Sequence, residues 1–224
     1  MMRRVLFLWL AAVMGAIVFI IPPAEGLGNV VKIAFFHIPL AWVSVLGFLL
    51  SAYWGIQYLR TGEMYYDLKS STAAKLGLFF CIFATLSGMV FAKLTWGAYW
   101  NWDPRQITIF ILLLIYGSYI TLRSAIPNII TRARTSAVYG LFAFFTVPFL
   151  MFIIPRFYFS LHPEPIINRL GRLDMDSIMA YGLLLTLVTS TALFRQILCY
   201  LLKKEYRKYP ANMADRIGKD GMKL

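Results

Sequence analysis

Long apolar segments separated by short polar connections make up most of the chain. The predominantly apolar segments occupy residues 5–21, 37–58, 76–92, 107–122, 137–154 and 177–200. A helix of about twenty apolar residues is needed to cross the hydrocarbon core of a bilayer. The pattern therefore predicts an all-α integral membrane protein with six transmembrane helices and with both termini on one side.

The first apolar segment has two interpretations. It follows a basic start at Arg3 and Arg4, and the small residue Ala24 lies soon after Pro22-Pro23, as in a cleaved signal peptide. The segment is, however, long for a signal core, and no A-x-A cleavage pattern follows it. We therefore expect an uncleaved first span.

Prolines and polar residues predict where the other helices begin, bend and end. Pro39 suits the first turn of a helix, which places His37 just before the second span. Ile126-Pro127 should stop the fourth helix, and Pro148 should kink the fifth. Polar connections are expected at residues 60–74 and 155–176.

Composition supports the membrane assignment. Hydrophobic residues make up 60% of the chain and charged residues 14%, whereas soluble domains have about half and about a quarter. The net charge of +12 suits basic residues that border spans and contact anionic lipid, so we expect a lipid bilayer as partner and no nucleic acid. Residues 1–202 then form one transmembrane domain, and residues 203–224 form a basic tail.

The distribution of positive charge predicts the orientation. The first residues, the second and fourth connections, and the tail with Arg195 hold 16 of the 22 Lys and Arg residues. Cytoplasmic loops carry the excess of Lys and Arg, so both termini and the basic tail should be cytoplasmic. His37, the aromatic segment at residues 95–106 and His162 should then all lie on the outer face.

The two cysteines point to no chemistry. Cys81 and Cys199 fall inside apolar segments and belong to no CxxC, haem-attachment or zinc pattern. We expect buried free thiols.

The chain has only two histidines, His37 and His162, and both fall in predicted outer connections. Two imidazoles on opposite sides of a haem iron form a known axial arrangement. The alternative is that interfacial histidines simply bind water or lipid headgroups. Their spacing alone leaves both possibilities open.

Four large aromatic residues gather between the third and fourth spans: Trp96, Tyr99, Trp100 and Trp102. Interfacial aromatic belts are common in membrane proteins, but a belt spreads its residues over many helices. If residues 95–103 are helical, Trp96, Tyr99, Trp100 and Asp103 share an arc of about 100° and form a flat apolar platform.

Asp103 and Arg105 begin the fourth span. Asp103-Pro104-Arg105-Gln106 fits a helix N-cap, a proline at the first position and a capping-box-like glutamine at the third. Asp103 is therefore expected mainly as a cap, with a ligand role secondary. Arg105 is not required by the cap, and its guanidinium suits a carboxylate such as a haem propionate, with a lipid phosphate as the alternative.

With these residues assembled, the chain resembles haem-handling proteins of the cytochrome c assembly superfamily, which includes CcmC, CcmF and CcsA. The resemblance rests on the tryptophan-rich (WWD-type) signature Trp96-Gly97-Ala98-Tyr99-Trp100-Asn101-Trp102-Asp103-Pro104-Arg105 and on the two flanking histidines. Tyr99 stands where many relatives have another tryptophan. The length and span number are most similar to the CcmC-like members, and the similarity covers nearly the whole chain.

The resemblance implies a protein of the bacterial inner membrane that binds haem b transiently and non-covalently at its outer face. His37 and His162 would be the axial iron ligands, and the signature residues Trp96, Gly97, Tyr99, Trp100, Trp102, Asp103 and Arg105 would hold the haem. A periplasmic CcmE-like chaperone would receive the haem covalently, and CcmA-, CcmB- and CcmD-like ABC subunits would be further partners. The protein itself would be a delivery protein rather than an enzyme.

Three other functions compete. A complete cytochrome c synthase usually has additional spans and histidines, which this chain lacks. A haem-bearing electron-transfer subunit would place its histidines inside spans rather than in loops. A small-solute transporter would need polar residues at mid-membrane, which the apolar segments lack.

Overall fold

The computed structural model describes residues 2–161 and 175–207, and these residues are all-helical apart from their connections. Five stretches are long and apolar enough to cross a membrane: Asn29–Thr61, Met64–Trp96, Pro104–Ala125, Ile129–Phe157 and Ser177–Tyr206. These correspond to the second to sixth predicted spans. The first predicted span falls in helix α1 (Met2–Ile20), of which the described apolar stretch, Ala11–Ile20, is too short to count. A crossing by the first span, and therefore a total of six, stays a prediction.

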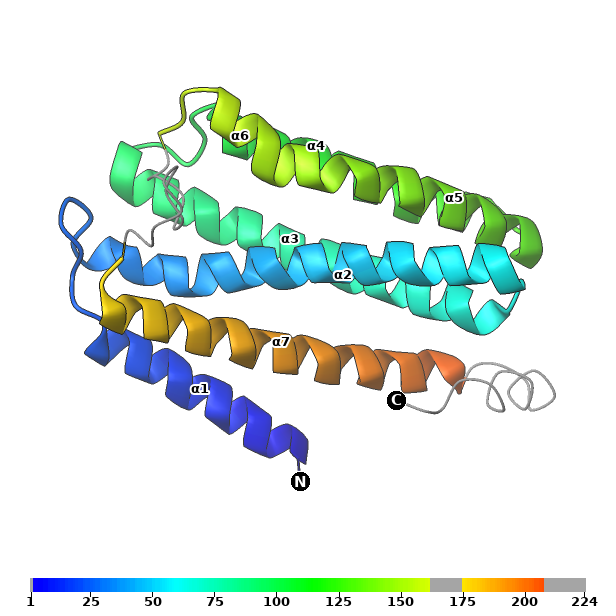
Figure 1. Ribbon diagram of the computed structural model, residues 1–224, viewed down its shortest axis with the longest axis horizontal. Helices are drawn as coiled ribbons and strands as arrows, with labels where there is room; N and C mark the ends of the chain where they lie inside the picture. Colours follow the sequence, from blue (N-terminus) through cyan, green and yellow to red (C-terminus); the bar gives the residue numbers. More distant parts are fainter. Residues whose placement is uncertain (1, 162–174, 208–224) are drawn as a thin grey trace.

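The helices form a bundle whose connections gather at two ends (Figure 1). The long helices are α2 (Ala34–Thr61), α3 (Met64–Trp96), α4 (Pro104–Ala125), α5 (Ile129–Pro148) and α7 (Ser177–Tyr206). The α1–α2 and α3–α4 connections and the start of α7 lie at one end, on the left of Figure 1. The α2–α3 and α4–α5 turns lie at the other. The described parts of the three connections that were predicted to share a side thus do lie together.

The connection between α2 and α3 is much shorter than predicted. Only Gly62 and Glu63 separate the two helices, and Gly62 has the left-handed backbone (φ 72°) that commonly ends a helix. The polar loop expected at residues 60–74 is therefore wrong. These polar residues continue α3 because their side chains find partners in the bundle, as when Ser70 Oγ donates to the backbone oxygen of Ser51 at 2.8 Å.

A buried ion pair joins the same end of α3 to α4. Arg123 donates two hydrogen bonds to the carboxylate of Asp67, at 2.6 and 2.5 Å. The two side chains are only 12% and 3% exposed. Such a paired geometry satisfies both planar groups, and removing either partner would leave a buried charge without its counter-ion.

Pro127 and Pro148 act where the sequence predicts. The α4 helix ends at Ala125, directly before Ile126-Pro127. Regular α-helix in α5 ends at Pro148, after which a π-helical turn, η2 (Phe149–Ile153), and a short helix, α6 (Ile154–Phe157), extend the same rod. The predicted connection at residues 155–176 therefore begins slightly later, after Phe157. Proline removes a backbone donor and crowds the turn before it, and the wider turn directly precedes Pro155.

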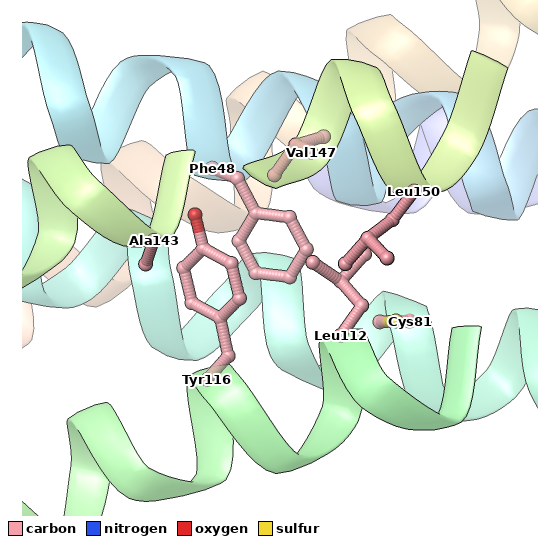
Figure 2. Packing of buried hydrophobic residues seen from close by; sticks show 7 residues of the cluster. All are labelled: Phe48, Cys81, Leu112, Tyr116, Ala143, Val147 and Leu150. Atoms are coloured by element: carbon pink, nitrogen blue, oxygen red, sulfur yellow. The ribbon is translucent and has the colours of Figure 1, made fainter. Parts of the chain in front are cut away.

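The core of the bundle is aromatic and closely packed (Figure 2). Phe48 from α2 and Tyr116 from α4 stack with ring centroids 3.5 Å apart. The cluster is completed by Cys81, Leu112, Ala143, Val147 and Leu150. Cys81 is a buried free thiol, as predicted, whereas Cys199 is free and half-buried.

Glycines bring α2 and α3 into backbone contact. A Cβ atom added at Gly47 would lie 2.7 Å from the Cα of Gly77, so no side chain fits between the two helices. Close approach of this kind increases van der Waals contact between helices in lipid. The pair α2–α3 is also the most extensive helix contact in the described part of the chain.

Candidate functional site

A cavity of about 530 Å³ lies at the end of the bundle that carries the α3–α4 connection. This volume is within the range of small-molecule and cofactor pockets. The walls come from the 24–41 region, α3, the start of α4, the η2–α6 region and the start of α7. The lining residues that bear on its chemistry are His37, Gly88, Trp100, Arg105, Gln106 and Arg156.

His37 borders this cavity from inside α2 rather than from a loop. The helix begins at Ala34, one turn earlier than predicted, because the 3₁₀ turn η1 (Asn29–Ile33) leads directly into it. Pro39 therefore lies inside the helix and not at its first turn. The expected position of His37 just before a helix is wrong, although the residue does lie at the expected end of the bundle.

Helix α3 orients the His37 ring. Its Nδ1 lies 2.9 Å from the backbone oxygen of Ala84 and 3.1 Å from Ser87 Oγ. Because a carbonyl oxygen only accepts, Nδ1 carries the hydrogen, and Nε2 keeps the lone pair in the neutral ring. A hydrogen bond of this kind on the second nitrogen is typical of metal-binding histidines. Nε2 is thus the atom available to a ligand.

Gly88 makes room for the same ring. A Cβ added there would lie 2.9 Å from His37 Cε1 and 3.4 Å from Nδ1. Neither Ser87 nor Gly88 is predicted from the sequence as part of the site. Their only signal is a small polar residue followed by glycine in the middle of an apolar span, and many close helix contacts produce the same pattern.

The aromatic segment does not form the predicted helical platform. Helix α3 ends at Trp96, and Gly97 follows with a left-handed backbone (φ 82°), so residues 97–103 form a non-helical connection. A shared arc requires a continuous helix, so the predicted arc is absent. Of the four aromatic residues, only Trp100 lines the cavity.

The other aromatic residues of the signature lie around this connection. Trp96 packs edge-on against Phe91, which does line the cavity, with centroids 5.7 Å apart. Lys93 lies over the Tyr99 ring at 5.7 Å. Trp102 is 73% exposed, has a φ of 55°, and meets Trp100 edge-on at 5.9 Å. A bulky residue with positive φ is unusual and marks a backbone held by its surroundings.

Asp103 is the N-cap of α4, as predicted. Its carboxylate accepts from the backbone N–H of Arg105 at 2.9 Å, and Pro104 occupies the first helical position. The same carboxylate also accepts from Ser160 Oγ and from the backbone N–H of Leu161 at 2.7 Å. Asp103 is buried, does not line the cavity, and joins two connections.

Gln106 lies at the third helical position but does not close a standard capping box. Its Oε1 accepts from the backbone N–H of Asn101 at 2.7 Å, and its Nε2 donates to the backbone oxygen of Tyr99 at 3.2 Å. A capping-box glutamine would instead reach the N–H of Asp103. Gln106 therefore holds the aromatic connection against the start of α4.

Two arginines border the cavity. Arg105 comes from the first turn of α4, as predicted, and Arg156 comes from α6. Arg156 was not identified from the sequence, because a single arginine in a connecting segment carries no pattern. The second predicted iron ligand, His162, lies outside the described residues.

Apart from Thr85 and Thr108, the remaining walls are apolar, with Met89, Met151, Met175 and Met179 among them. Flexible methionine side chains can adapt to the shape of a flat ligand. One imidazole with a free nitrogen, an aromatic ring, apolar walls and two cations fit a flat, apolar, acid-bearing ligand that contains a metal. Haem has these properties: iron takes imidazole ligands, and guanidinium binds carboxylates.

Comparison with known proteins gives a consistent result. The family model for heme exporter protein C (CcmC) matches residues 1–214. A Heme exporter protein C of Bradyrhizobium diazoefficiens is 30% identical over 173 residues, which cover 75% of this chain and 63% of the relative. One of Paracoccus denitrificans is 25% identical over 190 residues, or 85% and 79% of the two chains.

Shorter matches extend to proteins with other names. A putative cytochrome c biosynthesis ccmC-like mitochondrial protein of Marchantia polymorpha is 36% identical over 89 residues, which cover 40% of this chain and 39% of the relative. A cytochrome c biogenesis protein CcsA of Ranunculus macranthus is 37% identical over 81 residues, or 36% and 25% of the two chains. The chain thus spans less than two thirds of the Bradyrhizobium relative and well under half of the Marchantia relative.

Proposed function

Because this chain belongs to the heme exporter protein C (CcmC) family, we propose that it binds haem b at the outer end of a membrane bundle and hands it on for cytochrome c biogenesis. The observation that carries the proposal is the His37 ring. Its Nδ1 is held by α3, and its Nε2 remains available at an apolar cavity that arginines border. Haem would be bound transiently and without a covalent bond.

In this proposal each named residue has a role. His37 supplies one axial nitrogen and His162 the other, Trp100 packs against the macrocycle, and Arg105 binds a propionate.

The connection around Trp100 has a supporting role. It is shaped by the other signature residues, Trp96, Gly97, Tyr99 and Trp102, and Asp103 holds it in place. Haem itself would supply only its iron and its apolar edge, and the protein would orient it and restrict water.

The cellular setting completes the proposal. The chain would cross the bacterial inner membrane six times with both termini in the cytoplasm, which places the cavity at the periplasmic face. A CcmE-like chaperone would receive the haem covalently, and CcmA-, CcmB- and CcmD-like subunits would assemble with the bundle. The protein would deliver haem and would not be an enzyme. The names of the relatives and the positive-inside charge distribution support this setting.

Spectroscopy of the purified full-length protein tests haem binding. We expect a Soret band after purification from haem-replete cells or after titration with haem. His37→Ala and His162→Ala should each change the axial-ligand bands, whereas Gln57→Ala, at the far end of α2, should not. If the wild-type protein shows no Soret band and takes up no haem, the proposed function is wrong.

A second measurement separates delivery from the alternatives. The position of His37 inside a helix removes part of the argument against an electron-transfer subunit, because ligands of such bundles also lie in spans. Delivery predicts that a CcmE-like chaperone acquires covalent haem when this protein is present. A synthase would mature an apocytochrome directly, and an electron-transfer subunit would keep its haem and change its oxidation state.

A further inference from the structure

The charged residues of the cavity lie on one side of it. Arg105 comes from α4 and Arg156 from α6, and these two helices are neighbours in the bundle (Figure 1). The region that leads into α2 and the start of α7 contribute apolar residues instead, among them Val31, Ile38 and Met179. The cavity therefore has a cationic side and an apolar side.

From this arrangement we infer that Arg156 is a second carboxylate-binding residue, and that the cavity selects a flat apolar ligand with two acid groups along one edge. The inference rests on the proposed function and adds to it a residue, a ligand class and an orientation. The acid edge lies toward α4 and α6, and the apolar edge lies toward η1 and the start of α7.

Arg156 borders the cavity and is accessible to a bound carboxylate. It is an exposed residue of α6, and the buried Pro155 beside it fixes the backbone of that short helix. Arg156 makes no hydrogen bond or ion pair with any residue that the structure describes. A guanidinium at the edge of an apolar cavity gains most from a bound carboxylate, because its planar donors match both oxygens.

Arg105 is held differently, and this difference supports a two-point site. Its backbone N–H is bonded to Asp103, so the first turn of α4 fixes where its side chain begins. Two cations on separate elements can each bind one acid group of the same ligand, so the arrangement suits a ligand with two acid groups better than a ligand with one. Charged groups in such partly dry sites discriminate strongly between ligands.

Binding measurements with haem and with its dimethyl ester test the inference, because the ester lacks both carboxylates and keeps the iron and the macrocycle. The full-length protein would be titrated with each ligand by absorption spectroscopy. Arg156→Gln should weaken haem binding by about tenfold. This factor corresponds to the low end of the free energy that a hydrogen bond to a charged group contributes at an exposed site. Binding of the ester should stay within about twofold, a small difference on the same affinity scale.

Two further variants sharpen the result. Arg156→Lys keeps the charge and should restore part of the affinity for haem, while the double variant with Arg105→Gln should bind haem and ester about equally. Arg134→Gln removes an exposed arginine near the start of α5, which follows the α4–α5 turn at the opposite end of the bundle (Figure 1). It is the matched control and should change neither affinity.

Each outcome decides between the two proposals. If Arg156→Gln weakens haem and ester equally, or weakens neither, Arg156 does not bind a carboxylate and the inference is wrong, while haem binding stands. If the wild-type protein binds neither ligand, the proposed function fails and this inference fails with it.

Discussion

At the scale of single residues, the site depends on how α3 receives the His37 ring. The ring takes a position on the α3 backbone, with the oxygen of Ala84 at Nδ1 and the bare Cα of Gly88 beside Cε1. The hydrogen bond selects the tautomer of His37, and the missing side chain of Gly88 sets how closely the ring approaches α3. A histidine placed in this way cannot rotate freely, so its free nitrogen points in a defined direction.

Gly88→Ala should disturb this arrangement directly. The added methyl would approach His37 Cε1 to 2.9 Å, so the ring must shift and lengthen its bond to Ala84. We expect altered axial-ligand bands and weaker haem binding, by roughly tenfold for a cost of about 1.4 kcal/mol. Gly117→Ala in α4, where an added Cβ meets nothing within 4 Å, is the control and should leave the spectrum unchanged. Equal spectra for both variants would contradict this placement of His37.

Trp100 and Trp102 offer a second comparison of neighbouring residues. Trp100 lines the cavity, whereas Trp102 is 73% exposed. Trp100→Phe should therefore weaken haem binding more than Trp102→Phe, with the difference about 1 kcal/mol or more because a buried ring contributes both area and contact. Titrations of the two variants measure it. A larger effect at Trp102 would show that haem lies outside the cavity.

Predictions for single residues were correct where neighbouring residues in the sequence determine the local structure. The cap at Asp103 follows from Asp-Pro-Arg-Gln alone, and the structure confirms it. The tie from Asp103 to Ser160 and Leu161 could not be predicted, because it joins residues 57 and 58 positions apart. The helical arc was wrong because Gly97 ends α3, and a glycine in a polar stretch is equally compatible with continued helix and with a cap.

At the scale of helices, the crossing of α2 and α3 holds the site together, since His37 lies on one helix and its partners on the other. Gly47 and Gly77 allow the two backbones to touch near mid-helix. The sequence predicted both spans but placed the start of α3 about twelve residues too late. The polar residues at its start resemble a loop in the sequence, because their partners on α2 and α4 are distant along the chain.

Gly47→Ala tests the importance of this crossing. Its Cβ would lie 2.7 Å from Gly77 Cα, and backbone atoms cannot move aside as a flexible side chain can. Overpacking of this kind costs about 1–3 kcal/mol. We expect a lower thermal unfolding temperature in detergent, with reduced haem retention as a secondary effect. The same change at Gly15, where an added Cβ meets nothing within 4 Å, should be nearly neutral. An unchanged unfolding temperature for Gly47→Ala would show that the helices can separate without loss.

At the scale of the whole molecule, the arrangement of connections agrees with the charge pattern. The α3–α4 connection, to which Trp102 belongs, lies at the cavity end of the bundle, and the α4–α5 turn, which follows Ser124 and Ala125, lies at the opposite end (Figure 1). The long apolar segments were sufficient to predict five of the spans, because a segment of this length and composition forms few structures other than a membrane helix. The orientation rests on the distribution of Lys and Arg and stays a prediction.

Thiol labelling in intact cells measures that orientation. In a Cys199→Ser background, Trp102→Cys should react with a membrane-impermeant maleimide added outside, because Trp102 is exposed at the cavity end. Ser124→Cys, exposed at the other end, should react only after the membrane is dissolved. Labelling of Ser124→Cys in intact cells, without labelling of Trp102→Cys, would place the cavity in the cytoplasm.

The Asp67–Arg123 pair has a consequence for how the protein is made. Helix α3 has 33 residues and is about 50 Å long, whereas the hydrocarbon core is about 30 Å thick, so its ends stand outside the core. Asp67 lies near one of these ends and gains its counter-charge only when α4 has docked in register. An unfinished bundle thus displays a bare carboxylate beside the membrane, and a finished one hides it. The pair therefore forms only once α4 has docked in register against α3, at the end of the bundle opposite the cavity.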